Sequence, residues 1–230
     1  MIHFYYHPSP NPAKVALMLE ECGLDYTLVP VDTRKGEQHD PAFLAVNPNA
    51  KTPAIVDEDA PGGPATVFDS NAILLYLAER TGRFLPPEGA AARGELLSWL
   101  MFIATGVGPY AGQAVHFQHM AEGENAYAVK RYRFEAWRHW RVLDERLEGR
   151  DHVLGDAYTI VDMALWGWAR PIPFVLGEGA WDELPHVRRL FERIEARPAA
   201  ARAAALKDAH GFKGEMDREA REALFPFIKG

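Results

Sequence analysis

Two short polar runs, residues 9–11 (Ser-Pro-Asn) and residues 69–70 (Asp-Ser), carry groups that could bind and stabilise an anion. Ser9 offers a hydroxyl and Asn11 a side-chain amide, and both lie where a helix is predicted to begin. Ser70 lies at the predicted start of another helix, where backbone N–H groups and the positive end of the helix dipole favour a negative charge. Taken alone, each run is also explained by a turn or a helix cap, with no binding role.

The elements that would position these runs follow from the pattern of the first third of the chain. Residues 2–6 are strand-like, and Pro12 suits the first position of a helix that has Asn11 as its N-cap. Gly23 is predicted to end that helix, and residues 26–31 form a second strand. Strand, helix and strand within about thirty residues form a βαβ unit, whose two strands run parallel.

The pattern then predicts a short helix, a hairpin and a strongly apolar helix. The short helix covers residues 41–46, and the hairpin pairs residues 54–56 with residues 66–68 across a long loop. Ser70 opens the apolar helix, which is expected to end at Gly82. This region therefore has the order βαβ, connector, ββα.

The remainder of the chain contains no convincing strand. A stretch rich in Pro, Gly and Ala at residues 84–92 predicts a linker, which separates a domain of residues 1–83 from an all-helical domain of residues 93–230. Thr159-x-x-Asp162 has the spacing of a helix capping box. Helices are predicted over residues 93–104, 129–147, 163–168, 190–194 and 217–225.

Composition excludes several classes of protein. With 230 residues, 48% of them hydrophobic and 25% charged, the chain is typical of a globular protein. A net charge of −7 argues against sequence-independent binding of nucleic acid. No apolar run approaches the ~20 residues of a membrane helix, and no secretion signal is visible. We therefore expect a cytoplasmic protein that binds neither nucleic acid nor membrane.

Cysteine and histidine usage narrows the possible chemistry. Cys22 is the only cysteine, so the chain has no intrachain disulfide and no C-x-x-C dithiol. We expect Cys22 to be a small buried residue on the inner stripe of its helix. The nine His residues have no carboxylate or thiol partners at recurring ligand spacing, and no metal site is predicted.

The order of elements, together with three motifs, resembles the cytosolic glutathione transferases. Residues 47–56 (Asn-Pro-x-x-Lys-Thr-Pro-Ala-Ile-Val) resemble the loop into the third strand, in which the proline at Pro53 is cis. Residues 68–74 (Phe-Asp-Ser-Asn-Ala-Ile-Leu) resemble the motif that holds the γ-glutamyl end of glutathione, and Thr159-x-x-Asp162 resembles the capping motif of the helical domain. The resemblance implies an α/β thioredoxin-like N-terminal domain (βαβαββα) followed by an all-α C-terminal domain.

Three further segments resemble the nu class of that family. They are residues 8–11 (Pro-Ser-Pro-Asn), residues 35–38 (Lys-Gly-Glu-Gln) and residues 115–119 (Val-His-Phe-x-His). The nu class includes bacterial glutathione-dependent disulfide reductases and resembles a fungal nitrogen regulator. Its usual triplet is Thr-Pro-Asn; Ser9 keeps the hydroxyl and lacks one methyl group.

The resemblance also implies roles for individual residues. Ser9 and Asn11 would be catalytic, because donors aimed at the glutathione sulfur favour its thiolate. Ser70 would bind the γ-glutamyl carboxylate, and Asp69 its ammonium. The implied glutathione-binding residues are Gln38, Lys51, Thr52, Pro53, Asp69, Ser70 and Arg131. His116, Phe117 and His119 would either line a pocket for the second substrate or pack in the core.

These roles predict an enzyme that uses glutathione as cosubstrate and no metal. Its thiolate would serve disulfide exchange, conjugation or thioether cleavage on a small electrophilic or disulfide substrate. Two alternatives are a catalytically weak regulatory protein of the same fold and, less favoured, a carrier of hydrophobic ligands. The resemblance implies a homodimer. The apolar residues Ala220, Leu224 and Phe227 predict that the tail, residues 207–230, packs back on the body, over the pocket for the second substrate.

Overall fold

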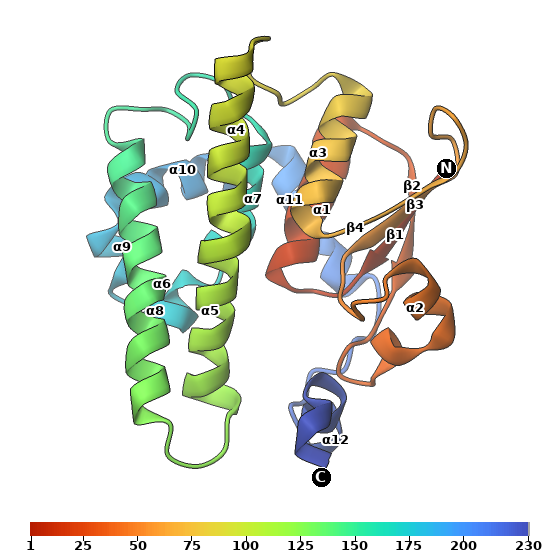
Figure 1. Ribbon diagram of the computed structural model, residues 1–230, viewed down its shortest axis with the longest axis vertical. Coiled ribbons are helices and arrows are strands. Elements are labelled where there is room, and N and C mark those ends of the chain that lie inside the picture. The colour runs from red at the N-terminus through yellow and green to blue at the C-terminus, as the bar shows by residue number, and fades with distance from the viewer. Residues whose placement is uncertain (230) are drawn as a thin grey trace. The chain divides into compact units, whose positions relative to one another are not determined.

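The computed structural model describes residues 1–229, and the chain divides into two compact units (Figure 1). One unit combines residues 1–77 with the C-terminal segment that begins at Pro198, and the other contains residues 78–197. These limits differ from the expected domains of 1–83 and 93–230 with a linker at 84–92. Helix α3 (Ser70–Thr81) crosses the first limit, α4 (Ala90–Phe102) begins inside the expected linker, and the tail groups with the first unit.

The first unit is built on a four-stranded sheet. Its strands are β1 (Ile2–Tyr6), β2 (Tyr26–Pro30), β3 (Ala54–Asp57) and β4 (Ala65–Phe68), in the order β2-β1-β3-β4. β1 and β2 are parallel, whereas β3 is antiparallel to both of its neighbours. The predicted βαβ unit and hairpin are therefore confirmed.

Helices cover this sheet and extend into the tail. In Figure 1, α1 (Pro10–Cys22) and α3 lie on one side of the sheet, and α2 (Pro41–Val46) lies on the other. The interior of α1 is buried and apolar except for Lys14, and Gly23 ends the helix in the left-handed conformation, as predicted. Cys22, expected to be buried, is half-buried in the last turn. The remaining helical segments of the unit are η1 (Glu37–His39), α11 (Pro198–Ala205), η4 (Leu206–Asp208), α12 (Arg218–Leu224) and η5 (Pro226–Lys229).

The second unit is helical in residues 78–197, apart from one isolated β-bridge between His152 and Gly155. It contains α4, η2 (Ile103–Val107), α5 (Gly108–Val115), η3 (His116–Met120), α6 (Ala126–Leu147), α7 (Ile160–Ala169), α8 (Ile172–Leu176), α9 (Ala180–Glu183) and α10 (Pro185–Glu195). The predicted capping box is present, since Thr159 and Asp162 exchange hydrogen bonds at the start of α7. In the part of the chain that the structure describes, no helix is long and apolar enough to cross a membrane.

Candidate functional site

Strand register brings several chain segments to one end of the sheet. Tyr5 in β1 lies opposite Ala54, and Ala54 lies opposite Phe68, so the end of β1, the beginning of β3 and the end of β4 share an edge. The end of β2 lies at the same edge, because Tyr6 is paired with Pro30.

Most of the predicted site residues follow or precede these strand ends directly. Residues 9–11 come just after β1, Pro53 comes just before β3, and residues 69–70 come just after β4. Gln38 lies in η1, in the connection that leaves the end of β2. The sheet therefore gathers these four segments of the chain at one edge.

The start of α1 differs from the expected capping. Helix α1 begins at Pro10, and Ser9 rather than Asn11 is its N-cap. Ser9 is extended, with φ −148° and ψ 166°, because a residue that precedes proline is excluded from the helical region. Its hydroxyl makes no capping hydrogen bond and donates only a long 3.5 Å bond to the carbonyl of His7.

Asn11 occupies the first turn of α1 rather than its cap. Pro10 and Pro12 flank it and have no backbone N–H, so Asn11 supplies the only backbone N–H among the first three residues of the helix. Its side chain is half-buried. Asn11 therefore supplies both a side-chain amide and the backbone N–H donor of the first three helical residues.

The start of α3 is organised by Asp69. Its backbone is left-handed, with φ 69°, and its Oδ1 accepts from the backbone N–H groups of Asn71 at 2.9 Å and Ala72 at 3.2 Å. Ser70 is buried and begins the helix, as predicted. The Asp69 carboxylate accepts from the N–H groups of Asn71 and Ala72. The hydroxyl and N–H of Ser70 are therefore the donors that this turn can offer an anion.

The loop before β3 is held by a residue that sequence analysis did not assign to the site. The side chain of buried Asn47 donates to the carbonyl of Lys51 at 2.5 Å, and its Oδ1 accepts from the N–H of Asn49 at 3.0 Å. The Thr52–Pro53 peptide is cis, as the resemblance implied, and the Lys51 side chain is exposed. The signal for Asn47 was its place in the Asn-Pro turn, which can hydrogen-bond to nearby backbone.

Gln38 is held by the tail. Its side chain is only 3% exposed, and its Nε2 donates to the carbonyl of Ala223 in α12 at 2.9 Å. The Phe212 ring makes edge contacts with Tyr6 and His7, at centroid distances of 6.0 and 5.2 Å. The tail therefore packs back on residues 1–77, as expected, although Phe227 of its predicted apolar face is 74% exposed. Its place over a pocket for the second substrate stays a prediction.

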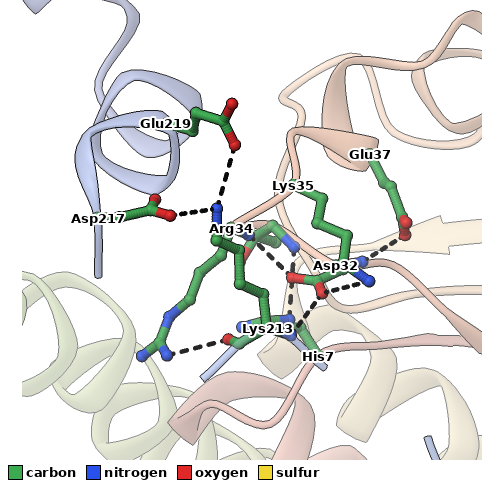
Figure 2. A network of polar contacts seen from close by, with 9 residues as sticks. His7, Asp32, Arg34, Lys35, Glu37, Lys213, Asp217 and Glu219 are labelled. Atoms are coloured by element: carbon green, nitrogen blue, oxygen red, sulfur yellow. Dashed lines mark hydrogen bonds and ion pairs between the residues drawn. The ribbon is translucent and has the colours of Figure 1, made fainter. Parts of the chain in front are cut away.

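A polar network around Asp32 anchors the tail through Lys213 (Figure 2). The buried Asp32 carboxylate accepts from the backbone N–H of Lys213 at 2.7 Å and that of Arg34 at 3.1 Å. Burial raises the pKa of Asp32, but these two hydrogen bonds and Lys35 outweigh it, so that the net shift is downward. Arg34 donates to the Lys213 carbonyl at 3.1 Å. No local pattern could have indicated the contacts with Lys213, because Lys213 lies about 180 residues from its partners Asp32 and Arg34 in the chain.

Arg131 lies in α6 of the second unit and pairs there with Glu135 at 2.8 Å. A hydrogen bond from Arg138 is the main cause that lowers the pKa of Glu135. Since Arg131 belongs to the other unit, its contact with glutathione stays a prediction.

The predicted lining of the second pocket also lies in the second unit. The Phe117 ring stacks on Tyr132 at 5.3 Å, and the His119 ring stacks on Phe174 at 4.2 Å. Burial lowers the pKa of His116. These stacks lie within the helical unit, but no residue of η3 is buried and His119 is exposed, so the choice between pocket lining and core packing stays a prediction.

Comparison with known proteins agrees with this arrangement. Residues 8–80 match the N-terminal domain of the glutathione S-transferases, and residues 113–198 match their C-terminal domain. The disulfide-bond oxidoreductase YfcG of Escherichia coli is 43% identical, over 88% of this chain and 94% of that protein.

Two solved structures show the same fold with ligands. A glutathione transferase family member from Pseudomonas fluorescens, with two glutathione molecules bound, superposes with a TM-score of 0.84 at 42% identity, over 88% of this chain and 92% of that one. A transferase from Pseudomonas putida, with glutathione disulfide bound, gives a TM-score of 0.82 at 36% identity, over 88% and 90% of the two chains. The chain belongs to the glutathione transferase family and is an enzyme of this glutathione-binding type.

Proposed function

We propose that this chain is a nu-class glutathione transferase that reduces disulfide bonds with glutathione. The observation that carries the proposal is the strand register, which gathers residues 9–11, Pro53 and residues 69–70 at one edge of the sheet. The YfcG relative, named a disulfide-bond oxidoreductase, supports this choice among glutathione-dependent reactions.

The reaction takes both of its thiols from glutathione. One glutathione thiolate attacks a sulfur of the substrate disulfide, forming a mixed disulfide and releasing the other half as a thiolate. A second glutathione thiolate then attacks the glutathione sulfur of the mixed disulfide, giving glutathione disulfide and the second substrate thiolate. Cys22, the only cysteine, lies at the far end of α1 from Asn11 and takes no part.

Each end of glutathione has its own set of residues in this proposal. Asn11, assisted by Ser9, stabilises the thiolate at the start of α1. Ser70 receives the γ-glutamyl carboxylate, Asp69 the ammonium, and Thr52 beside Pro53 pairs with the cysteinyl backbone. Lys51 and Gln38 serve the glycyl end, and Arg131 stays a glutathione contact that the resemblance implies. The Gln38 Nε2 donates to the carbonyl of Ala223 and lies 3.2 Å from the Nε2 of His39.

The protein is proposed to act in the cytoplasm as a homodimer. The apolar residues that would favour association are exposed on the helical unit, with Met101 in α4 44% exposed and Phe134 in α6 62% exposed. Light scattering at micromolar concentration should give twice the chain mass of 25.7 kDa. A monomer mass would contradict the dimer and leave the proposed reaction unaffected.

The reaction is tested with the purified protein, glutathione and hydroxyethyl disulfide, beside a parallel assay with a chlorinated nitrobenzene. We expect turnover of the disulfide, with lower or no conjugation. Cys22→Ser is the matched control and should retain full activity, because the protein thiol is not used. Glutathione binding without turnover of either substrate would instead support a regulatory protein of this fold.

A further inference from the structure

Lys14 is a buried cation inside helix α1. Its side chain is 1% exposed, and its Nζ donates to the Oδ1 of Asn71 at 2.9 Å. Removing an ammonium from water is costly unless the charge is well paired. Its place near the N-terminus of α1 adds to the cost, because that end of the helix dipole is positive. An apolar side chain of the same length would suit the core better, so stability alone does not account for this lysine.

The position of Lys14 connects two parts of the proposed site. It follows Asn11 by three residues, and residues three apart lie on the same face of a helix. Its partner Asn71 directly follows Ser70 at the start of α3. Lys14 therefore joins the turn that would hold the thiol to the turn that would hold the γ-glutamyl end.

Asn71 is fixed from two sides. Its backbone N–H is bound by the Asp69 carboxylate, and its side-chain oxygen is bound by Lys14. Asp69 holds a left-handed backbone, with φ 69°, which Asp tolerates better than most residues. The direction of the Ser70 hydroxyl and N–H depends on this turn, and hence on the contact between Lys14 and Asn71.

The charges of this turn match the charges of a free α-amino acid group. Lys14 is positive and Asp69 negative, while the γ-glutamyl end of glutathione carries one carboxylate and one ammonium. The buried Lys14 ammonium contacts Asn71, the residue after Ser70, and the Asp69 residue is exposed.

We propose that Lys14 is a positioning residue for the γ-glutamyl group: through Asn71 it orients the first turn of α3, and its charge attracts the ligand carboxylate bound there. The proposal rests on the proposed function, since it assigns a role within that glutathione site. Lys14 acts through Asn71 and is not itself a catalytic residue.

Protonation gives this role a measurable signature. Burial lowers the pKa of Lys14 to about 7, and the negative charge of Asp69 opposes that shift. Helix α11, which also packs on α1, carries Arg202, and Arg202 pairs with Glu20 far from Lys14 along the helix. In β1 the ionisable groups are His3, which pairs with Glu58, and two tyrosines. Binding of a carboxylate favours the charged lysine, so affinity should fall as pH rises through 7.

The test measures binding of S-methylglutathione by calorimetry, because this probe has both ends of glutathione and no thiol that titrates. Lys14→Met keeps the length and removes the charge and the hydrogen bond. We expect its Kd to rise at least tenfold and its affinity to become nearly independent of pH between 6 and 8, whereas wild-type affinity falls over that range. In the disulfide assay, KM for glutathione should rise much more than kcat falls.

Two further variants separate positioning from folding. Lys14→Gln is neutral but can still donate to Asn71, so it should restore part of the affinity without restoring the pH dependence. Asn71→Ala removes the acceptor and should weaken binding even if Lys14→Met does not fold. Lys207→Met, at an exposed site in η4, is the matched control and should leave binding unchanged.

The outcomes distinguish the two proposals. If wild-type protein binds S-methylglutathione and folded Lys14→Met and Asn71→Ala bind it equally well, the role of Lys14 is overturned and the proposed function stands. If wild-type protein binds neither glutathione nor the probe, the proposed function fails and the role of Lys14 fails with it.

Discussion

The two ends of the proposed glutathione site are held in different ways. The start of α3 is held by its own neighbours in the sequence, since Asp69 binds the N–H groups two and three residues further on. The Gln38 side chain is held by Ala223, 185 residues away. The first arrangement needs one turn of backbone and the contact of Asn71 with Lys14 in α1, whereas the second also needs the C-terminal tail in place.

This difference indicates which end of the site can open locally while the core stays folded. The start of α3 is capped by Asp69 and held by the buried side chain of Lys14, so its geometry is tied to the core of the first unit. A contact with a terminal segment can open locally without unfolding the core, because chain ends have few packed contacts. We therefore expect the γ-glutamyl end to set the basic affinity and the Gln38 end to modulate it.

The largest effect on kcat is expected at Asn11. This residue is proposed to face the thiol of glutathione, which lies between the two ends of the ligand. Asn11→Ala should lower kcat by about 10²–10³-fold, as loss of one donor to a reacting anion typically does. KM for glutathione should change little, because the two ends of the ligand keep their contacts. Ser9→Ala should cost less, since its hydroxyl is weakly engaged at 3.5 Å and can rotate.

Kinetics of both variants, with an ultraviolet titration of the bound thiolate, decide this point. Loss of the thiolate in Ser9→Ala and its retention in Asn11→Ala would assign the serine as the main activator. That result would contradict the nu-class assignment.

At the α3 end, Asp69→Ala should raise KM for glutathione by about tenfold, because loss of an exposed charge pair and loss of a helix cap each cost about 1 kcal/mol. Asp69→Asn is the matched control for folding, because asparagine can also cap the helix and tolerates a left-handed backbone. It should retain the melting temperature and lose affinity for the ligand ammonium. Equal KM values for wild type and both variants would remove Asp69 from the site.

At the Gln38 end, a chain that stops after Ala205 loses the contacts of Phe212, Lys213 and Ala223 with the first unit. We expect the free energy of unfolding to fall by about 2 kcal/mol, from lost hydrogen bonds and ring packing. For a chain of this size that corresponds to a decrease in Tm of about 4–8 °C. KM for glutathione should change only a few-fold. A larger change in KM than in Asp69→Ala would reverse the comparison between the two ends.

The smallest effect concerns the pH dependence of the tail anchor. The pKa of Asp32 is lowered in the folded protein, so its ionised form contributes stability above its unfolded pKa of about 3.9. This contribution is lost as pH falls through the lowered folded value. Between pH 6 and pH 3, the melting temperature should therefore decrease more steeply for wild type than for Asp32→Asn. Parallel curves would show that the carboxylate charge does not anchor the tail.

Local features of the site were predictable because they depend on neighbouring residues. The hairpin, the helix that begins at Ser70 and the capping box at Thr159 all follow from hydrophobic period and capping chemistry. The N-cap of α1 was predicted two residues too late, at Asn11 instead of Ser9. The rule that a residue before proline avoids the helical region identifies Ser9 as the cap, and the prediction gave more weight to Pro12 than to Pro10.

The sequence by itself determined the order of elements, the helix starts that could bind an anion, and the family. Only the tertiary structure decided that Lys14 is buried against Asn71 and that Ala223 binds Gln38. Helix caps and strand periods arise from contacts within a few residues, and those are visible in the chain as written. Burial of a charge and contact with a distant tail depend on which surfaces meet after folding, and no short stretch of sequence specifies that meeting.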